Sequence, residues 1–318
     1  MISLITPIFN EEDIVVRLHQ EVCAAFDSMG LPWEVIYVDD GSRDKSLALL
    51  LEMQRHDNHI VIAELSRNWG HQPAVTAGLS IARGDAVVMM DGDLQDPPKV
   101  IPELVEAWRN GAEVVIAERR SRMESGLRKH LFPLFYKVFG FLSDYPIPLN
   151  AGILGLMDRR VVDTLLCLTE TNRYLPGLRA WVGFKTAVVF YDRAERAAGE
   201  PKQTLGRLIR YALDAIFSFS YKPVRLTLGF GMLTAVASVF IGFFLVFCRI
   251  FGIGLFGSPV VYGYTSTLVF ILLLAGVQLT SIGILGEYIG RIYDEVKRRP
   301  LFVIRKVHDS RPGAPHES

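Results

Sequence analysis

Short apolar runs alternate with amphipathic stretches along the first 120 residues of the chain. Five of these runs have strand length and carry Val, Ile and Leu at consecutive positions, which is typical of strands buried on both faces. They span residues 3–9, 34–39, 60–65, 86–90 and 113–117. Between them, residues 11–28, 45–56, 73–82 and 98–110 show helical periodicity. This alternation predicts an α/β fold with a mostly parallel sheet and helices on both faces.

Two later stretches, residues 226–248 and 250–286, contain no charged side chain. A helix needs about 20 apolar residues to cross the hydrocarbon core of a bilayer. The pattern therefore predicts two transmembrane helices, roughly 226–248 and 264–286. The alternative, a pair of buried soluble helices, is disfavoured because soluble helices of this length and apolarity are uncommon.

Basic residues flank the two predicted spans at their outer ends. Lys222 and Arg225 precede the first span, and Arg291 and residues 297–299 follow the second. The positive-inside rule then places both outer ends in the cytoplasm. We expect a multi-pass protein of the cytoplasmic (inner) membrane with three parts: a cytoplasmic domain with juxtamembrane amphipathic helices (1–221), the two spans (222–290) and a cytoplasmic tail (291–318).

Residues 118–149 form a basic segment that becomes aromatic toward its end. Its first half carries Arg119, Arg122, Arg128 and Lys129. The pattern fits an amphipathic helix lying on a membrane. It fits equally a helix packed on the sheet with a solvated basic end, so both interpretations stay open.

Polar turns follow three of the predicted strands, at residues 7–11, 39–42 and 91–96. The carboxyl ends of parallel strands meet at one edge of a sheet, where ligands of open α/β sheets bind. Asp91 and Asp93, with the side-chain carbonyl of Gln95, offer the oxygen ligands that Mg²⁺ or Mn²⁺ prefers when it bridges phosphates. Asp39 is expected to face the ligand, whereas Asp40 or Ser42 is expected to cap the next helix.

Composition mainly argues against certain classes of partner and site. The chain of 318 residues has 34 basic and 34 acidic side chains, which gives no reason to expect a nucleic-acid partner. The three cysteines lack metal-ligand spacing, and His56 and His59 are expected at the surface. No signal peptide is expected, because the N-terminus begins a strand directly.

Taken in order, the motifs at residues 6–12, 38–42, 66–70, 91–98, 152–159, 217–220 and 286–291 are similar to those of family 2 glycosyltransferases of GT-A fold. Within that family the chain resembles the polyprenyl-phosphate glycosyltransferases, a subgroup that includes bactoprenol glucosyltransferases and dolichol-phosphate mannose synthases. The last segment and the paired spans are typical of this subgroup. The resemblance covers the chain to about residue 305.

The resemblance implies roles for individual residues. It places four residues around the nucleotide: Pro7, Asn10, Glu11 and Asp39. It assigns Asp91, Asp93 and Gln95 to the metal, with Asp91 also binding the donor and Asp93 also acting in catalysis. Lys202 aligns with a basic position that follows a Gly in the family, and it is a candidate for contacting either phosphate group. Arg119, Arg122, Arg128 and Lys129 are our candidates for holding the acceptor phosphate, and Arg122 and Arg128 are the two assigned to catalysis. A solvated basic surface is the alternative for each of them.

The implied reaction transfers a sugar from a nucleotide diphosphate sugar, expected to be a UDP-sugar, to polyprenyl (undecaprenyl) phosphate. The product is a lipid-linked monosaccharide for modification of cell-envelope glycans. The expected partners are this donor, the lipid acceptor and the membrane, with a homo-oligomer left open. The alternatives are a membrane-anchored sugar-nucleotide-binding protein with weak or no transfer activity, and a polysaccharide synthase, whose Gln-x-x-Arg-Trp motif is missing here.

One segment departs from the family pattern. Where relatives often carry two acidic residues, this chain has Asn150 and Ile153. A phosphate acceptor is already anionic near neutral pH, so it needs a general base less than a hydroxyl acceptor does.

Overall fold

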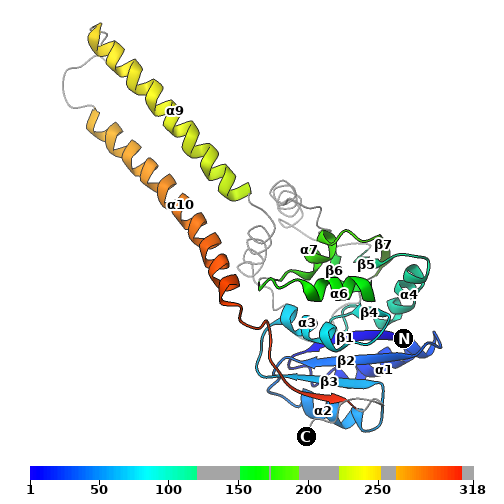
Figure 1. The fold of residues 1–318 in the computed structure, drawn as a ribbon. Helices are drawn as coiled ribbons and strands as arrows, with labels where there is room; N and C mark the ends of the chain where they lie inside the picture. The colour runs from blue at the N-terminus through cyan, green and yellow to red at the C-terminus, as the bar shows by residue number, and fades with distance from the viewer. Residues whose placement is uncertain (120–150, 172, 193–221, 252–262, 310–318) are drawn as a thin grey trace.

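The structure is a computed structural model that describes residues 1–119, 151–171, 173–192, 222–251 and 263–309. Its centre is an eight-stranded sheet with the order β7-β5-β6-β4-β1-β2-β3-β8 (Figure 1). The strands are β1 (Ile2–Ile8), β2 (Trp33–Asp39), β3 (Ile60–Leu65), β4 (Ala86–Met89), β5 (Val114–Arg119), β6 (Ala151–Asp158), β7 (Thr186–Tyr191) and β8 (Ile304–Asp309). The strand pairs β4-β1, β1-β2, β2-β3 and β5-β7 are parallel, whereas β6 and β8 run antiparallel to their neighbours. The predicted mostly parallel α/β sheet is confirmed.

Helices cover both faces of the sheet, and a separate pair follows. Within the described residues they are α1 (Val15–Asp27), α2 (Ser46–Gln54), α3 (His71–Ile81), the 3₁₀ turn η1 (Pro98–Val100), α4 (Ile101–Arg109), α6 (Arg159–Cys167), α7 (Leu175–Trp181), α9 (Lys222–Ile250) and α10 (Gly263–Lys297). The helices predicted from periodicity all exist. Their observed ends differ from the predicted ones by a few residues.

Two hydrophobic layers explain why the strands read as continuous apolar runs. Side chains such as Leu4, Tyr37 and Ile62 pack with α1, α2 and α4. Their neighbours along the strands, such as Ile5 and Val38, pack with α3, α6 and α7 on the other face. Successive side chains point to opposite faces, so a strand covered on both sides needs apolar residues at every position.

The strand register brings the polar turns together. Ile8 in β1 lies beside Asp39 in β2, and Ile5 in β1 lies beside Met89 in β4. The turns that follow these strands therefore leave the sheet at the same edge. This confirms the shared edge that the sequence predicted for residues 7–11, 39–42 and 91–96.

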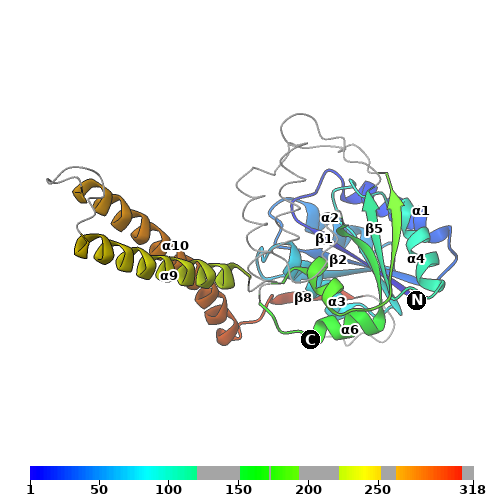
Figure 2. The ribbon, with the colours of Figure 1, turned by 90° about the horizontal axis from the view of Figure 1, so that it is seen from above.

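Helices α9 and α10 run antiparallel, side by side, away from the sheet (Figures 1 and 2). Both are long and apolar enough to cross a membrane. Their large apolar side chains face outward: Leu228 is 64% exposed, Phe243 74% and Leu279 69%. The predicted pair of long apolar helices is confirmed, and α10 continues to Lys297, beyond the expected end at 286.

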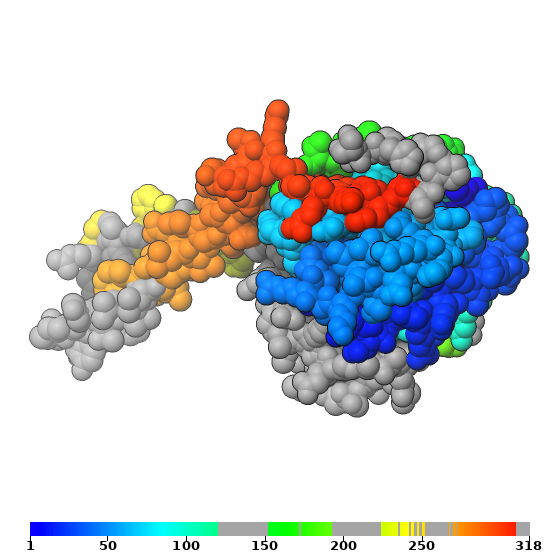
Figure 3. All heavy atoms as spheres, turned by 90° about the horizontal axis from the view of Figure 1, so that it is seen from below, coloured from blue at the N-terminus to red at the C-terminus, as the bar shows by residue number. Residues whose placement is uncertain are grey.

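The chain returns from α10 to the sheet. Strand β8 pairs antiparallel with β3 and lies at the surface of the domain (Figure 3). Within the segment expected as a cytoplasmic tail from residue 291, residues 291–297 are helical and residues 304–309 complete the sheet. The strand has no period-2 alternation, because the register shift opposite Glu64 and Leu65 skips Arg305. The limit at residue 221 stays a prediction.

Candidate active site

Two adjoining cavities lie at the carboxyl edge of the sheet. The larger, of about 520 Å³, is lined by the turns after β1, β2 and β3 together with Arg305 of β8. The smaller, of about 310 Å³, lies between the turns after β1 and β4. Phe9 and Asn68 line both cavities, so the two spaces share a boundary. One extended ligand can occupy both.

The loops after β1 and β2 are held together by side chains of both. Asn10, whose φ is +54°, receives the Arg43 N–H on its side-chain oxygen at 2.8 Å and donates its own N–H to the Ser42 hydroxyl at 3.1 Å. The Glu11 N–H donates to the Ser46 hydroxyl at 2.9 Å. Asparagine tolerates a positive φ better than most residues, which suits it to this turn. These bonds fix the floor of the larger cavity.

Asp39 and Asp40 make different contacts, although they are neighbours in the sequence. Asp39 lines the larger cavity and accepts the Ser42 N–H at 3.3 Å. Asp40 accepts the N–H groups of Trp69 and Gly70 at 2.7 and 3.0 Å, and so anchors the segment that begins α3. Burial raises the pKa of both carboxyls above the ordinary value.

The expected capping role of Asp40 or Ser42 is therefore wrong. Helix α2 begins at Ser46, and Asp44 accepts the Ser46 N–H at 3.0 Å. Asp40 instead accepts a hydrogen bond from Trp69, just before α3, and the Ser42 hydroxyl accepts one from the Asn10 N–H. Sequence spacing alone did not reveal this long-range use of Asp40.

Gly41 allows the turns after β2 and β3 to approach each other. Its φ is +70°, and a Cβ atom there would lie 2.7 Å from the Arg67 carbonyl carbon and the Asn68 nitrogen. Both atoms belong to the backbone, so they cannot move aside as a flexible side chain can. The close approach places Arg67 and Asn68 in the cavity wall beside Asp39.

The acidic turn after β4 is held by neighbouring groups. Asp91 Oδ1 lies 2.7 Å from His71 Nε2, and Asp93 Oδ1 accepts the Gln95 N–H at 3.1 Å. A Cβ on Gly92 would lie 2.9 Å from the Pro7 carbonyl oxygen, so this turn sits tightly against the end of β1. Both aspartates line the smaller cavity.

His71 is a site residue that sequence reasoning missed. Partial desolvation lowers its pKa, but the hydrogen bond and charge of Asp91, with Asp40 and Asp93 nearby, raise the pKa above its ordinary value overall. Its side chain is 42% exposed at the mouth of the smaller cavity. His71 is the first residue of α3 and directly follows the motif at residues 66–70. Its position next to this motif is the sequence feature that could have indicated a role in the site.

Arg119 lies at the end of β5, beside the acidic turn. Its Nε donates to the Tyr191 hydroxyl at 3.1 Å, and that hydroxyl donates to Asp96 Oδ1 at 2.6 Å. Arg119 Nη2 is also 3.6 Å from Asp96 Oδ1. Burial, together with Asp96, raises the pKa of Tyr191 to about 12, so this hydroxyl keeps its proton.

The predicted site residues divide into three groups. Pro7, Glu11, Asp91 and Asp93 line the smaller cavity, and Asn10 and Asp39 line the larger one. Gln95 contributes its backbone N–H to Asp93, and neither cavity lining includes it. Arg122, Arg128, Lys129 and Lys202 lie outside the described residues, as do residues 120–149 of the predicted basic segment. Arg67 and Asn68, within the motif at residues 66–70, and Arg305 also line the larger cavity, and no individual role was predicted for them.

A mostly parallel sheet whose carboxyl edge carries an Asp-x-Asp turn beside a nucleotide-sized cavity is the arrangement of a GT-A-type, nucleotide-dependent transferase. The sequence profile described as "Glycosyl transferase family 2" matches residues 3–166. The chain belongs to this family, and it is a glycosyltransferase.

Relatives align along nearly the whole chain. The bactoprenol glucosyl transferase of Shigella phage SfII is 41% identical over 312 residues, which are 98% of this chain and 99% of that protein. The uncharacterized glycosyltransferase YkcC of Bacillus subtilis is 40% identical over 305 residues, 96% of this chain and 93% of the relative. Among solved structures, glucosyl-3-phosphoglycerate synthase from Mycobacterium tuberculosis with Mn²⁺, UDP-glucose and phosphoglyceric acid has a TM-score of 0.47 at 23% identity, over 69% of this chain and 79% of that chain.

Proposed function

We propose that this enzyme transfers a sugar from a nucleotide diphosphate sugar, expected to be a UDP-sugar, to polyprenyl phosphate. The observation that carries the proposal is the 41% identity to a bactoprenol glucosyl transferase over 312 residues, a length that includes both long apolar helices. The two adjoining cavities support the donor half of the reaction. The exposed apolar helices support a lipid as the other reactant.

The larger cavity suits the nucleoside. Asp39 and Asn10 present oxygen atoms for hydrogen bonds, and Arg67 and Arg305 add positive charge. Pro7 and Glu11 lie toward the smaller cavity, where the diphosphate and the sugar are placed in this proposal. The role of each of these residues is part of the proposal.

The acidic turn fits a divalent cation, Mg²⁺ or Mn²⁺. Asp91 and Asp93 would hold it, with Gln95 as the third predicted ligand. Among the described residues, the hydrogen bonds of both aspartates use Oδ1, so Oδ2 is the oxygen that each would offer to the ion. In the described part of the chain, no third His, Cys, Asp or Glu joins them to form a close ligand set. Phosphate oxygens of the donor would complete the coordination, as is usual for Mg²⁺. When bound, such an ion neutralises charge on the leaving diphosphate.

The reaction is a displacement at the anomeric carbon. An oxygen of the acceptor phosphate forms a bond to this carbon, the bond to the donor's β-phosphate oxygen breaks, and the nucleoside diphosphate leaves with that electron pair. The acceptor is already anionic, so no proton must be removed. Ile153, only 7% exposed in β6, is compatible with a site without a base at that position. Positioning and charge stabilisation then account for most of the catalysis.

Cations must hold the acceptor phosphate. Arg119 is suitably placed, since it stands beside the acidic turn and is oriented by Tyr191. Arg122 and Arg128 follow it in the sequence, and we assign them to the acceptor phosphate as well, because arginine can clamp a phosphate with two parallel hydrogen bonds. Lys202 is assigned to either phosphate group.

We place the sheet domain at the cytoplasmic face of the inner membrane, with α9 and α10 crossing the bilayer. Basic residues at the outer ends of the helices support this orientation. The reactants are then a soluble donor from the cytoplasm and a lipid acceptor in the membrane. A homo-oligomer remains compatible with this arrangement.

The direct test is transfer of radiolabel. Purified protein is incubated with a panel of labelled nucleotide sugars and undecaprenyl phosphate, and the lipids are then extracted. We expect label in the organic phase only when the lipid phosphate is present, and with one donor preferred. Label found only on water-soluble acceptors would contradict the lipid acceptor, and donor binding without turnover would contradict transfer.

A further inference from the structure

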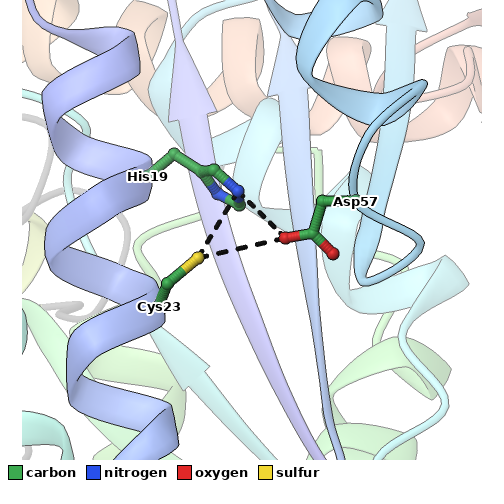
Figure 4. Close-up of side chains that lie close together, drawn as sticks. All are labelled: His19, Cys23 and Asp57. Carbon is green, nitrogen blue, oxygen red and sulfur yellow. Dashed lines mark hydrogen bonds and ion pairs between the residues drawn. The ribbon is translucent and has the colours of Figure 1, made fainter.

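Three potential metal ligands meet on the α1 side of the sheet, outside both cavities (Figure 4). His19 and Cys23 lie four residues apart on α1, and Asp57 lies in the loop between α2 and β3. His19 Nε2 is 3.1 Å from Asp57 Oδ2 and 3.5 Å from Cys23 Sγ. Cys23 Sγ is 3.9 Å from Asp57 Oδ2. One atom of each side chain therefore converges on a common point.

These separations match a tetrahedral metal site. Zinc binds nitrogen, oxygen and sulfur at about 2.0–2.3 Å, so two ligand atoms at tetrahedral angles lie about 3.3–3.6 Å apart. The three observed distances, 3.1, 3.5 and 3.9 Å, bracket this range. Small rotations of the side chains are enough to centre an ion among them.

Two of the ligands are also oriented by partners of their own. His19 Nδ1 is 3.1 Å from the hydroxyl of Tyr37, a residue buried in β2. The second oxygen of Asp57, Oδ1, lies 2.6 Å from His59 Nδ1 and accepts the His59 N–H at 2.8 Å. Metal-binding histidines and carboxylates in proteins usually have such outer hydrogen bonds, which fix the ring orientation and raise ligand basicity.

A nucleophilic triad is the competing interpretation of a Cys, a His and an Asp. A triad needs the cysteine and the carboxylate on opposite nitrogens of the imidazole. Here both lie at Nε2, while Nδ1 contacts Tyr37. Burial, reinforced by Asp57 and Asp27, raises the pKa of Cys23 to about 11, so the thiol is not an activated nucleophile.

We propose that His19 Nε2, Cys23 Sγ and Asp57 Oδ2 form a Zn²⁺ site. A mixed nitrogen, sulfur and oxygen set suits Zn²⁺ better than Mg²⁺ or Mn²⁺, which prefer oxygen alone. Binding displaces the Cys23 proton to solvent, and water supplies the fourth ligand. The ion joins α1 to the loop before the amino end of β3, whereas the candidate active site lies at the carboxyl edge of the sheet, so it would cross-link two segments of the fold away from that site.

Cobalt substitution tests the site in the full-length, detergent-purified and reduced protein. Co²⁺ bound to a thiolate gives a sulfur-to-metal charge-transfer absorption in the near ultraviolet, which an all-oxygen site cannot give. We expect this band to saturate at one equivalent of Co²⁺ and to disappear when one equivalent of Zn²⁺ is added. Zn²⁺ should also raise the Tm.

Matched variants identify the ligands. Cys23→Ser should abolish the band, whereas Cys167→Ser, which changes an exposed cysteine on α6, should keep it. Asp57→Asn should weaken Co²⁺ binding by at least about tenfold. Asp93→Asn, at the candidate active site, should leave the band unchanged.

No charge-transfer band in the wild-type protein at saturating Co²⁺ would overturn the proposal, whether or not Cys23→Ser folds. A band that survives in Cys23→Ser, or unchanged affinity in Asp57→Asn, would overturn it as well. None of these outcomes depends on glycosyl transfer, so failure here is distinguishable from failure of the proposed function.

Discussion

At the scale of single residues, the acidic turn makes the sharpest prediction. Asp93→Asn keeps the side-chain shape and removes the charge proposed to hold the divalent cation. Loss of charge stabilisation worth several kcal/mol should lower kcat about 10²–10³-fold. Steady-state kinetics with varied Mn²⁺ measures the loss, and excess EDTA should abolish wild-type activity.

Asp163→Asn is the matched control for Asp93→Asn. Asp163 is exposed on α6, and among the residues that the structure describes its ion pair is with Arg159 four residues earlier, so its substitution should leave kcat unchanged. Full activity of the wild-type enzyme in EDTA would show that the reaction needs no divalent ion.

His71 makes a second prediction at this scale. It orients Asp91 through the 2.7 Å contact, as an outer partner of a metal ligand does. His71→Ala should therefore raise the Mn²⁺ concentration for half-maximal activity by about 10–100-fold. His56→Ala, at an exposed histidine, is the control. Equal Mn²⁺ requirements in the two variants would remove His71 from the site.

Gly41 allows a comparison between two glycines with similar backbones. Gly41 and Gly183 have φ values of +70° and +74°, but a Cβ on Gly183 meets its nearest atom only at 4.0 Å. Alanine at either position bears the left-handed strain, and only Gly41→Ala adds a backbone clash. We expect Gly41→Ala to cost about 1–3 kcal/mol more stability than Gly183→Ala, measured by thermal unfolding. Equal losses would mean that the turn relaxes.

The sequence predicted the position of those site residues that directly follow the end of a strand. Asp39, Asp91 and Asp93 were placed at the correct edge because parallel strands end together. The sequence did not reveal His71 or the cluster of Cys23 with Asp57. Those partners are separated by 20 and 34 residues, and only tertiary packing brings them together.

At the scale of elements, apolar pattern predicted the strands β1 to β5 and missed β6, β7 and β8. Strands covered on both faces are nearly uniformly apolar, so β2 was easily recognised. Strand β8 lies at the sheet edge, reads Ile-Arg-Lys-Val-His-Asp and contains the register shift. The end of α10 was missed for a related reason: its last turns carry charges, so hydropathy stops before the helix does.

Strand β8 brings Arg305 into the wall of the larger cavity. Its guanidinium donates to Glu64 at 2.8 Å and to the Ser66 carbonyl at 3.0 Å. Because this ion pair is 61% exposed on the arginine side, Arg305→Ala should change stability by less than about 1 kcal/mol. We expect the donor KM to rise about tenfold, since a hydrogen bond to a charged group contributes about 1.5–3 kcal/mol.

Lys306→Ala is the matched control for Arg305→Ala. Lys306 is the next residue of β8, it is exposed, and the lining of neither cavity includes it. The acceptor KM should be unchanged in both variants. A donor KM that stays at the wild-type value in Arg305→Ala would assign this arginine to the sheet edge alone.

At the scale of the whole molecule, the sheet domain and the helix pair are joined at more than one point. Besides the chain connections, Glu295 near the end of α10 accepts the Thr171 N–H at 2.7 Å and the Thr171 hydroxyl at 3.2 Å. The Ser66 N–H donates to the Val303 carbonyl at 2.9 Å. The base of α10 is therefore fixed to the domain, and both outer helix ends lie on the domain's side.

This arrangement predicts the membrane topology. In intact cells, a membrane-impermeant thiol reagent added outside should label a cysteine placed at residue 258, between the helices. It should not label the native, exposed Cys167 or a cysteine at residue 306. After permeabilisation the latter two should react, and Cys167→Ser should remove the Cys167 signal. External labelling at residue 306 but not at 258 would reverse the topology.

The pairing of β8 with β3 has a consequence for biosynthesis. Gln54 donates to the His308 carbonyl across 254 positions of sequence, and β3 is made long before its partner strand. While α9 and α10 are being synthesised, β3 is an open edge, the kind of strand that recruits other chains. If the second helix failed to insert, β8 would remain on the opposite side of the bilayer from β3, and the edge of β3 would stay unpaired. The edge of β3 is therefore covered only when both helices have inserted correctly. A wrongly inserted chain keeps an exposed strand edge and is prone to aggregation or proteolysis.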